Sequence, residues 1–199
     1  MMGIFTKKNC DVCGEKIGLL GNKKLADGNM CKDCEKLLSP HFDDRRKSGL
    51  ADIKEHLAYR EENKQAVANF NVSRILGSYT KVLLDEEAGN LIVTSSENWV
   101  DDNPDVVHIS QVEKCQTRIQ DYRNELKRRD SSGTEVSFSP PRYEYEYDFY
   151  VTLGVDSPWF DNIGFKINDR RVYLYGSQEY REMERQAKEI EDSLMKNKI

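Results

Sequence analysis

Four cysteines near the start of the chain are the side chains best suited to chemistry. They form two pairs, Cys10 with Cys13 and Cys31 with Cys34, and each pair encloses two residues. Two intervening residues let one tight turn direct both sulfurs toward the same ion, and two such turns complete a tetrahedron. The spacing therefore predicts a metal site whose ligands are Cys10, Cys13, Cys31 and Cys34.

Zinc is the metal that we expect at this site, as one structural ion. Iron and iron–sulfur centres also accept four thiolates, so the spacing leaves zinc and iron open. A disulfide framework and a redox dithiol are less favoured, because the sequence shows no export signal and a redox dithiol uses a single Cys-x-x-Cys. Four thiolates close the coordination shell, so the ion is predicted to have no catalytic role.

The rest of the sequence offers no constellation that predicts an enzyme. The zinc-protease, serine-hydrolase and phosphate-loop motifs are all absent. His41 is redundant beside four cysteines, while His56 and His108 stand alone on an expected helix and strand. Cys115 has no neighbouring histidine and is interpreted as a buried apolar residue. We expect no catalytic and no cofactor-binding residue.

Composition and charge exclude several classes of protein. The 199 residues carry a formal net charge of -5, which argues against a protein that coats nucleic acid. No apolar run approaches the roughly 20 residues of a membrane-spanning helix, and the first residues lack an apolar signal-peptide core. These features predict a cytoplasmic protein with no transmembrane segment.

Three parts must position these residues. Residues 1–40 hold few large hydrophobic side chains, so metal binding is expected to supply their folding free energy. Their glycine-containing turns at Gly21-Asn22 and Asp27-Gly28 predict short strands. Residues 41–70 predict a charged linking helix with Ser48 as its N-cap and a narrow apolar stripe, which consists of Leu50, Ile53, Leu57, Val67 and Phe70.

Residues 71–199 predict an antiparallel β domain that ends in a helix. The clearest strand runs from Tyr143 to Val155, where apolar and aromatic residues alternate with mostly polar ones, so one face is expected to be buried. Its carboxylates are expected to face basic residues across the sheet, namely Arg118, Lys127, Arg128 and Arg129. Ser177 opens the last helix, whose apolar side chains recur every three or four residues.

The order of these elements predicts an α+β protein. It consists of a small four-cysteine zinc ribbon, a linking α-helix, and an antiparallel β-barrel or sandwich capped by a C-terminal helix. About seven short strands followed by one helix resemble a pleckstrin-homology-like barrel, and a sandwich with a docked helix remains open. Such domains bind lipids, peptides or proteins, so the likeness does not select a ligand.

The cysteine region also resembles a known family. Cys10-Asp11-Val12-Cys13-Gly14-Glu15-Lys16-Ile17 and the segment from Leu25 to Cys34 are similar to a family of uncharacterised bacterial proteins that begin with a zinc-ribbon domain of unknown function. The resemblance covers residues 8 to 40 and matches all four cysteines. It implies zinc binding and supplies no activity.

Three binding functions compete on this sequence. The leading hypothesis is a non-enzymatic adaptor whose ribbon and β domain bind other proteins. The first alternative is nucleic-acid binding by the ribbon lysines, which the charge balance disfavours; these are Lys7, Lys8, Lys16, Lys23, Lys24 and Lys32. The second is recognition of lipid headgroups, which the acidic excess over residues 71–175 disfavours. A homodimer formed through the 43–70 helix is left open.

Overall fold

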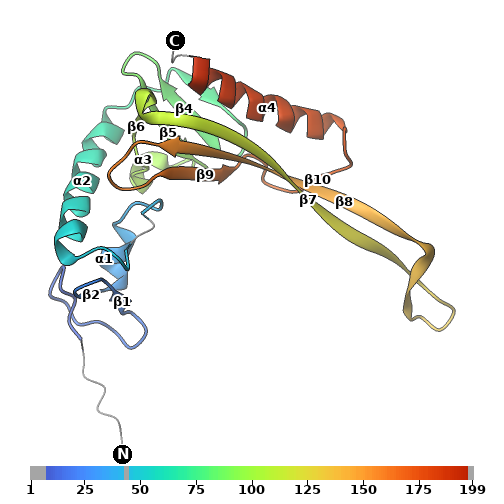
Figure 1. The fold of residues 1–199 in the computed structure, drawn as a ribbon, viewed down its shortest axis with the longest axis horizontal. Helices are drawn as coiled ribbons and strands as arrows, with labels where there is room; N and C mark the ends of the chain where they lie inside the picture. Colours follow the sequence, from blue (N-terminus) through green and yellow to red (C-terminus); the bar gives the residue numbers. More distant parts are fainter. Residues whose placement is uncertain (1–7, 43–44, 197–199) are drawn as a thin grey trace, which may run out of the picture. The chain divides into compact units, whose positions relative to one another are not determined.

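The computed structural model describes residues 8–42 and 45–196, and its contacts divide the chain into two units. Unit 1 contains the chain up to Phe70 together with Asn98–Val106 and Ser157–Asp161. Unit 2 contains Asn71–Glu97, Val107–Asp156 and Asn162–Ile199. The elements are coloured along the chain in Figure 1. The domain limits at residues 40 and 70 stay a prediction.

Unit 1 is a small β-ribbon with helices. Its described elements are β1 (Lys23–Lys24), β2 (Asn29–Met30), α1 (Lys32–Lys36), α2 (Leu50–Ala68) and α3 (Trp99–Asp102). β1 and β2 pair antiparallel across the predicted turn at Asp27-Gly28, where the Leu25 N–H donates to the Gly28 carbonyl at 2.9 Å. The turn at Gly21 forms as well, since its N–H donates to Gly18, but no strand flanks it on its first side in the described residues.

Helix α2 begins one residue later than the sequence predicts. Gly49, and not Ser48, is the N-cap. Its N–H donates to the Asp52 carboxylate at 2.8 Å, and the Leu50 N–H donates to Asp27 at 2.7 Å. Two carboxylates therefore satisfy N–H groups at the start of the helix, where the glycine cap has no side chain to do so. The apolar stripe is present, with Ile53 and Val67 buried.

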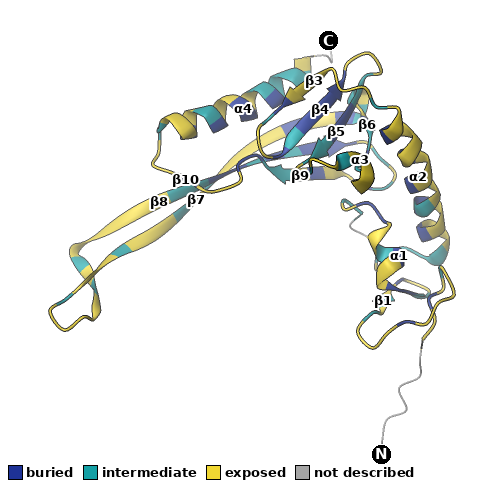
Figure 2. Ribbon diagram, turned by 180° about the vertical axis from the view of Figure 1, so that it is seen from behind, coloured by how far each residue is buried: buried dark blue, intermediate teal, exposed yellow. Residues whose placement is uncertain are grey.

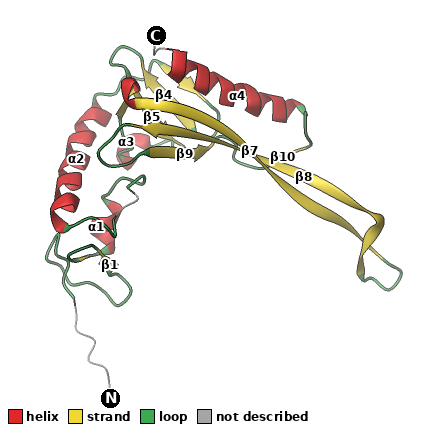
Figure 3. Ribbon diagram, viewed as in Figure 1, coloured by secondary structure: helices red, strands yellow, loops and turns green. Residues whose placement is uncertain are grey.

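Unit 2 contains two antiparallel four-stranded sheets and a long helix (Figure 3). The first sheet has the order β3-β4-β5-β6, and the second has the order β10-β8-β7 with β9 also paired to β8. Their bounds are β3 (Arg74–Leu76), β4 (Lys81–Asp85), β5 (Asn90–Thr94), β6 (Val107–His108), β7 (Val112–Arg129), β8 (Glu135–Val155), β9 (Asn162–Lys166) and β10 (Val172–Tyr173). A 3-10 turn, η1 (Ile109–Gln111), links β6 to β7.

The α+β class is confirmed, but the described strands do not close into a barrel. β7 and β8 pair mainly with each other, in register from Val112 opposite Val155 to Arg129 opposite Glu135. A barrel needs each strand to pair on both sides, and this long hairpin leaves β7 as an edge. The hairpin runs on as a two-stranded ribbon past β10 (Figure 1).

The C-terminal helix is confirmed as predicted. Helix α4 spans Gln178–Met195, and its N-cap Ser177 accepts the Tyr180 N–H at 3.1 Å. Its predicted apolar positions are buried, and the helix packs on β7, β8, β10 and β3. No helix in the described part of the chain is long and apolar enough to cross a membrane.

Burial of the 143–155 strand is confirmed only for its second half. Phe149, Val151, Leu153 and Val155 are buried, because α4 and its Tyr180 ring cover this part of β8. The outer tyrosines on the same face stay exposed, which appears in Figure 2 as the yellow outer half of the hairpin.

The prediction that basic residues of β7 pair with the carboxylates of β8 is wrong. Glu146 binds Arg171 at 2.8 Å, and Asp148 lies 3.3 Å from Lys166. The register places Arg128 and Arg129 opposite residues 136 and 135, too far along the ladder to reach these carboxylates.

Candidate metal centre

Two local turns bring the four cysteines together. Cys10 and Cys13 lie on a turn that closes when the Gly14 N–H donates to the Cys10 carbonyl at 2.7 Å, and Gly14 has φ +79, which favours glycine. Cys31 is the N-cap of α1, and Cys34 lies one turn later in that helix. Each Cys-x-x-Cys pair is thus shaped by its own few residues, as the spacing predicts.

The sulfur geometry fits one tetrahedral ion. All four Sγ atoms lie within 4.8 Å of one another. The Cys10–Cys34 and Cys13–Cys31 sulfur distances are both 3.8 Å. A tetrahedron with metal–sulfur bonds of about 2.3 Å has edges of about 3.8 Å. The donor set and its dimensions therefore match a four-thiolate metal site, and the sulfurs are the atoms that would hold the ion.

Backbone N–H groups point at two of the sulfurs. The Cys31 N–H donates to Cys10 Sγ at 3.3 Å, and the Cys34 N–H donates to Cys31 Sγ at 3.4 Å. Burial raises the pKa of the Cys10 thiol, but backbone hydrogen bonds from Cys13, Cys31 and Val12 outweigh it and bring that pKa down to about 7. Burial and the neighbouring thiols raise the pKa of Cys34. Four neighbouring sulfurs do not all ionise without a cation, because the thiolates repel one another. A bound cation offsets this repulsion.

The core of unit 1 surrounds the sulfurs. Cys10, Cys31 and Cys34 are buried, and they share a cluster with apolar side chains, which are Ile17, Leu25, Met30, Leu38 and Ile53. Cys13 is the exposed member. Because so few apolar side chains form this core, an ion bound by the sulfurs would supply a large share of its stability.

The histidines do not join this site. Among the described residues, the four cysteines are the only group of three or more ligand side chains whose atoms converge. The His41 ring instead lies 5.5 Å from that of Phe160. The thiol of Cys115 is buried in unit 2, and burial raises its pKa to about 11, which fits its interpretation as an apolar residue.

A buried polar network is the feature of unit 1 that the sequence does not reveal. Arg60 on α2 forms an ion pair with Asp105 at 2.7 Å, and both side chains are almost fully buried. Asp105 also accepts hydrogen bonds from Ser39 at 2.6 Å and from Tyr59 at 3.1 Å. Asn63 donates to the Pro104 carbonyl at 2.8 Å. These contacts fasten residues 103–106 to α2.

Ser39, His56 and Asp105 are the residue types of a hydrolytic triad, but their hydrogen bonds have a different order. The Ser39 hydroxyl donates to Asp105, and the His56 Nε2 accepts the Ser39 backbone N–H at 3.0 Å. A triad needs the imidazole to accept the hydroxyl proton and the carboxylate to orient the imidazole. Here the His56 ring is buried between two aromatic rings, with its centre 4.5 Å from that of Phe42 and 4.9 Å from that of Trp159. The three residues therefore do not form a hydrolytic triad, and their contacts contribute to the packing of unit 1.

Acidification is expected to destabilise unit 1 through His56. Burial lowers the pKa of His56 from 6.5 to about 4. The unfolded chain therefore takes up this proton first as the pH falls. The free energy of unfolding of unit 1 keeps its full value above pH 6.5 and decreases progressively down to about pH 4. The expected loss is about 3 kcal/mol.

Urea unfolding at several pH values measures this effect, with the His56→Gln variant as the control. Glutamine can still accept the Ser39 N–H but does not titrate. Comparing the two proteins removes the effect of acid on the cysteines. Equal pH slopes for wild type and variant would contradict the prediction.

Comparison with known proteins places the cysteines in a recognised segment. Residues 8–56 match a family model described as a domain of unknown function, DUF4428. The DUF4428 segment holds all four cysteines. It ends within α2, before Arg60, so it covers only part of the buried network. No curated protein and no solved structure matches the chain, so the pleckstrin-homology-like assignment of unit 2 stays a prediction.

Proposed function

We propose that this chain is a zinc-binding protein-interaction module that acts by binding and not by catalysis. The exposed tyrosine surface of unit 2 carries this proposal, and the metal centre has a structural part in it. The closed four-sulfur shell supports that division, because it leaves no coordination position for substrate. We further propose a cytoplasmic protein, since none of the five cysteines forms a disulfide.

Zinc is the proposed occupant of the four-cysteine site. A tetrahedral set of sulfur donors at the observed spacing suits zinc and iron, and zinc forms such closed structural sites most readily. Elemental analysis of protein purified without added metal tests this assignment. We expect one zinc per chain, whereas stoichiometric iron or less than half an equivalent of any metal would contradict it.

A groove in unit 2 is the proposed protein-binding surface. Its volume is about 320 Å³, and its lining residues come from β8 and from the segment that begins with β10; they are Tyr143, Glu144, Tyr145, Tyr147, Tyr173, Leu174 and Tyr175. Tyr173 is 60% exposed and Tyr175 is 70% exposed. Tyrosine is enriched at protein interfaces because its ring buries a large apolar area while its hydroxyl forms hydrogen bonds.

The backbone at Leu174 supports a binding role for this groove. Leu174 has φ +69 and is 71% exposed, so a large apolar side chain occupies the left-handed region in contact with solvent. That conformation costs about 1–2 kcal/mol for a residue with a Cβ. Neither strain nor apolar exposure stabilises the isolated chain, and such strain is concentrated at functional sites.

Replacing Leu174 is expected to separate binding from stability. Leu174→Gly should leave the thermal midpoint of unit 2 unchanged or raise it by a few degrees, because glycine adopts φ +69 without strain. The same variant, combined with Tyr173→Ser, should weaken partner capture about tenfold or more.

Capture from lysate with immobilised full-length protein measures the binding part of this prediction. Ile75→Ser is the matched control, since Ile75 is 55% exposed on β3, outside the groove. Proteins that are lost with the double variant and retained with the control would support the groove as the binding surface. An identical set of captured proteins for all three chains would contradict it.

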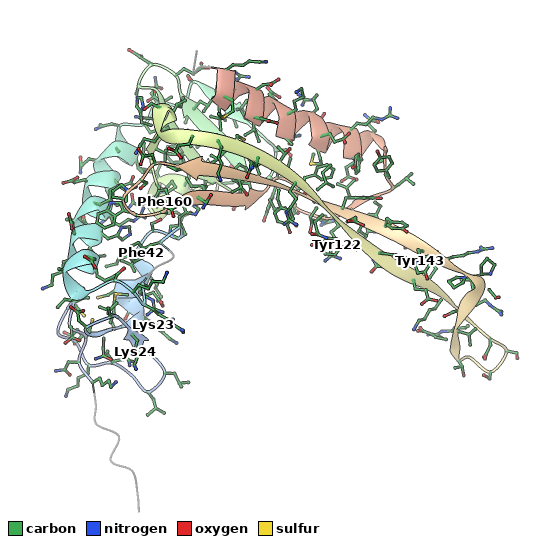
Figure 4. All side chains as sticks on the ribbon, in the orientation of Figure 1. Lys23, Lys24, Phe42, Tyr122, Tyr143 and Phe160 are labelled. Carbon is green, nitrogen blue, oxygen red and sulfur yellow. The ribbon has the colours of Figure 1, made fainter. Side chains whose placement is uncertain are left out.

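Nucleic-acid binding by the ribbon lysines is not favoured by any described contact. Lys7 lies outside the described residues, and Lys23, labelled in Figure 4, is already paired with Glu35 at 2.6 Å. This alternative stays a hypothesis, and absence of retention on heparin at low salt would exclude it.

A further inference from the structure

Strand β7 presents a long free edge. Among the described strands it pairs only with β8, so along Val112–Arg129 its other side has no strand partner. Most of its residues beyond Cys115 are exposed. A free edge offers a row of N–H and C=O groups to any strand that can align with it.

The outer half of the hairpin lacks the support that a stable sheet needs. From Asn124 opposite Glu144 to Arg129 opposite Glu135, only β7 and β8 pair with each other. Tyr143 lies on this part of the hairpin in Figure 4, and Tyr122 lies just inside it, opposite Glu146. An isolated two-stranded ribbon is at best marginally stable in water, and an additional strand stabilises it. The outer hairpin is therefore suited to pairing with another chain.

Four charged side chains on β7 have no ion-pair partner among the described residues. Asp121, Arg123, Glu125 and Lys127 alternate along one face of the strand and are all exposed. None of the four forms an ion pair within the described residues, although the Arg123 guanidinium lies 3.5 Å from the centre of the Tyr143 ring. These two acidic and two basic side chains can therefore form ion pairs with a second strand that carries the opposite order of charges.

That pattern is complementary to itself in one antiparallel register. If two copies of β7 pair with Asn124 at the two-fold axis, Arg123 faces Glu125 of the partner subunit, and Asp121 faces Lys127 of the partner subunit. On the other face, Tyr122 meets Leu126 of the partner subunit. Symmetry produces each of these pairs twice.

The neighbouring registers oppose like charges. An axis at Arg123 places Asp121 against Glu125, and an axis at Glu125 places Arg123 against Lys127. The β7 strand itself is regular here, because the irregularity after Leu126 lies in residues 138–141 of β8. Charge therefore selects the register at Asn124.

We propose that the chain forms a two-fold homodimer in which the β7 edges of two copies pair antiparallel with Asn124 at the axis. The two second sheets then become one continuous sheet, and each outer hairpin gains a neighbouring strand. This surface is distinct from the helix at residues 43–70, and it does not depend on the function proposed for the tyrosine groove.

Charge reversal at two positions tests this dimer in the full-length, metal-loaded protein. Sedimentation equilibrium should show a dimer for wild type and a dissociation constant about tenfold or more weaker for Arg123→Glu and for Glu125→Arg, since each reversal creates two like-charge pairs. An equimolar mixture of the two variants should dimerise again, because every residue 123 then faces an opposite charge at residue 125 of the other copy. The double variant should also recover the dimer. Glu87→Arg, exposed in the β4–β5 turn, is the control and should match wild type.

Circular dichroism establishes that the variants are folded, which is expected because both side chains are exposed. A monomeric wild-type protein would overturn the proposal. So would single variants that remain fully dimeric, or a mixture that stays monomeric when both variants are folded. A dimer that persists through both reversals and is lost on changing residues of α2 would assign the interface to the helix instead.

Discussion

Removing the metal should unfold unit 1 and leave unit 2 folded. The apolar cluster around the sulfurs is small, and structural zinc in such segments supplies an apparent 10–16 kcal/mol of folding free energy at pH 7, so about that order is lost with the ion. Thermal melting followed by circular dichroism, with and without a chelator, measures the effect. The transition assigned to unit 1 should disappear while the other stays at its original temperature.

The Cys31→Ser variant should reproduce the effect of the chelator. Cys31 is buried and supplies one sulfur, so its replacement removes a ligand from the ion, while a serine hydroxyl can still accept the Cys34 N–H at the start of α1. Cys115→Ala is the control, because this thiol is buried in unit 2 and does not belong to the four-sulfur cluster. The control should retain a full equivalent of metal. A chelator-treated protein that melts like the untreated one would contradict the structural role of the ion.

Breaking the buried ion pair should have the next largest effect. Asp105→Ala leaves the Arg60 guanidinium buried with no carboxylate and removes the acceptor used by Ser39 and Tyr59. Loss of one partner of a buried pair typically costs about 3–5 kcal/mol, because the remaining charge stays desolvated. Urea unfolding should show that the free energy of unfolding of unit 1 decreases by that amount. Lys64→Ala removes an exposed pair on the same helix and should cost less than about 0.5 kcal/mol.

A double-mutant cycle identifies the interaction responsible. The Arg60→Ala and Asp105→Ala changes should cost much less together than the sum of their separate effects, because the second change removes the charge that the first one left unpaired. Arg60 also donates a hydrogen bond to the Asn103 carbonyl, and we expect this bond to stabilise unit 1 less than the ion pair with Asp105 does. Additive effects would show that the two residues stabilise unit 1 independently, contrary to the geometry.

Local spacing was sufficient to predict the four-cysteine cluster and the C-terminal helix. Two residues between cysteines bring both sulfurs to one side of a single turn, and Gly14 supplies the left-handed backbone that the first turn uses. The stripe from Tyr180 to Leu194 has the period of one helix, so it identifies the buried face without reference to the rest of the chain. Alternation from Tyr143 to Val155 likewise identified one face of β8, although only its residues from Phe149 to Val155 are buried.

Features that depend on distant segments could be seen only in the folded chain. Nothing near Arg60 indicates that its partner is Asp105, and an isolated His56 on a charged helix gives no sign that aromatic rings enclose it. Tyr143 and Tyr145 continue the alternation of β8, yet they are exposed because α4 covers only the inner part of the strand. The spacing of neighbouring residues sets turns and helical faces, because backbone geometry repeats over a few residues. Burial, ion pairing and the free edge of β7 depend on which distant segments pack there, and that is decided by the tertiary structure.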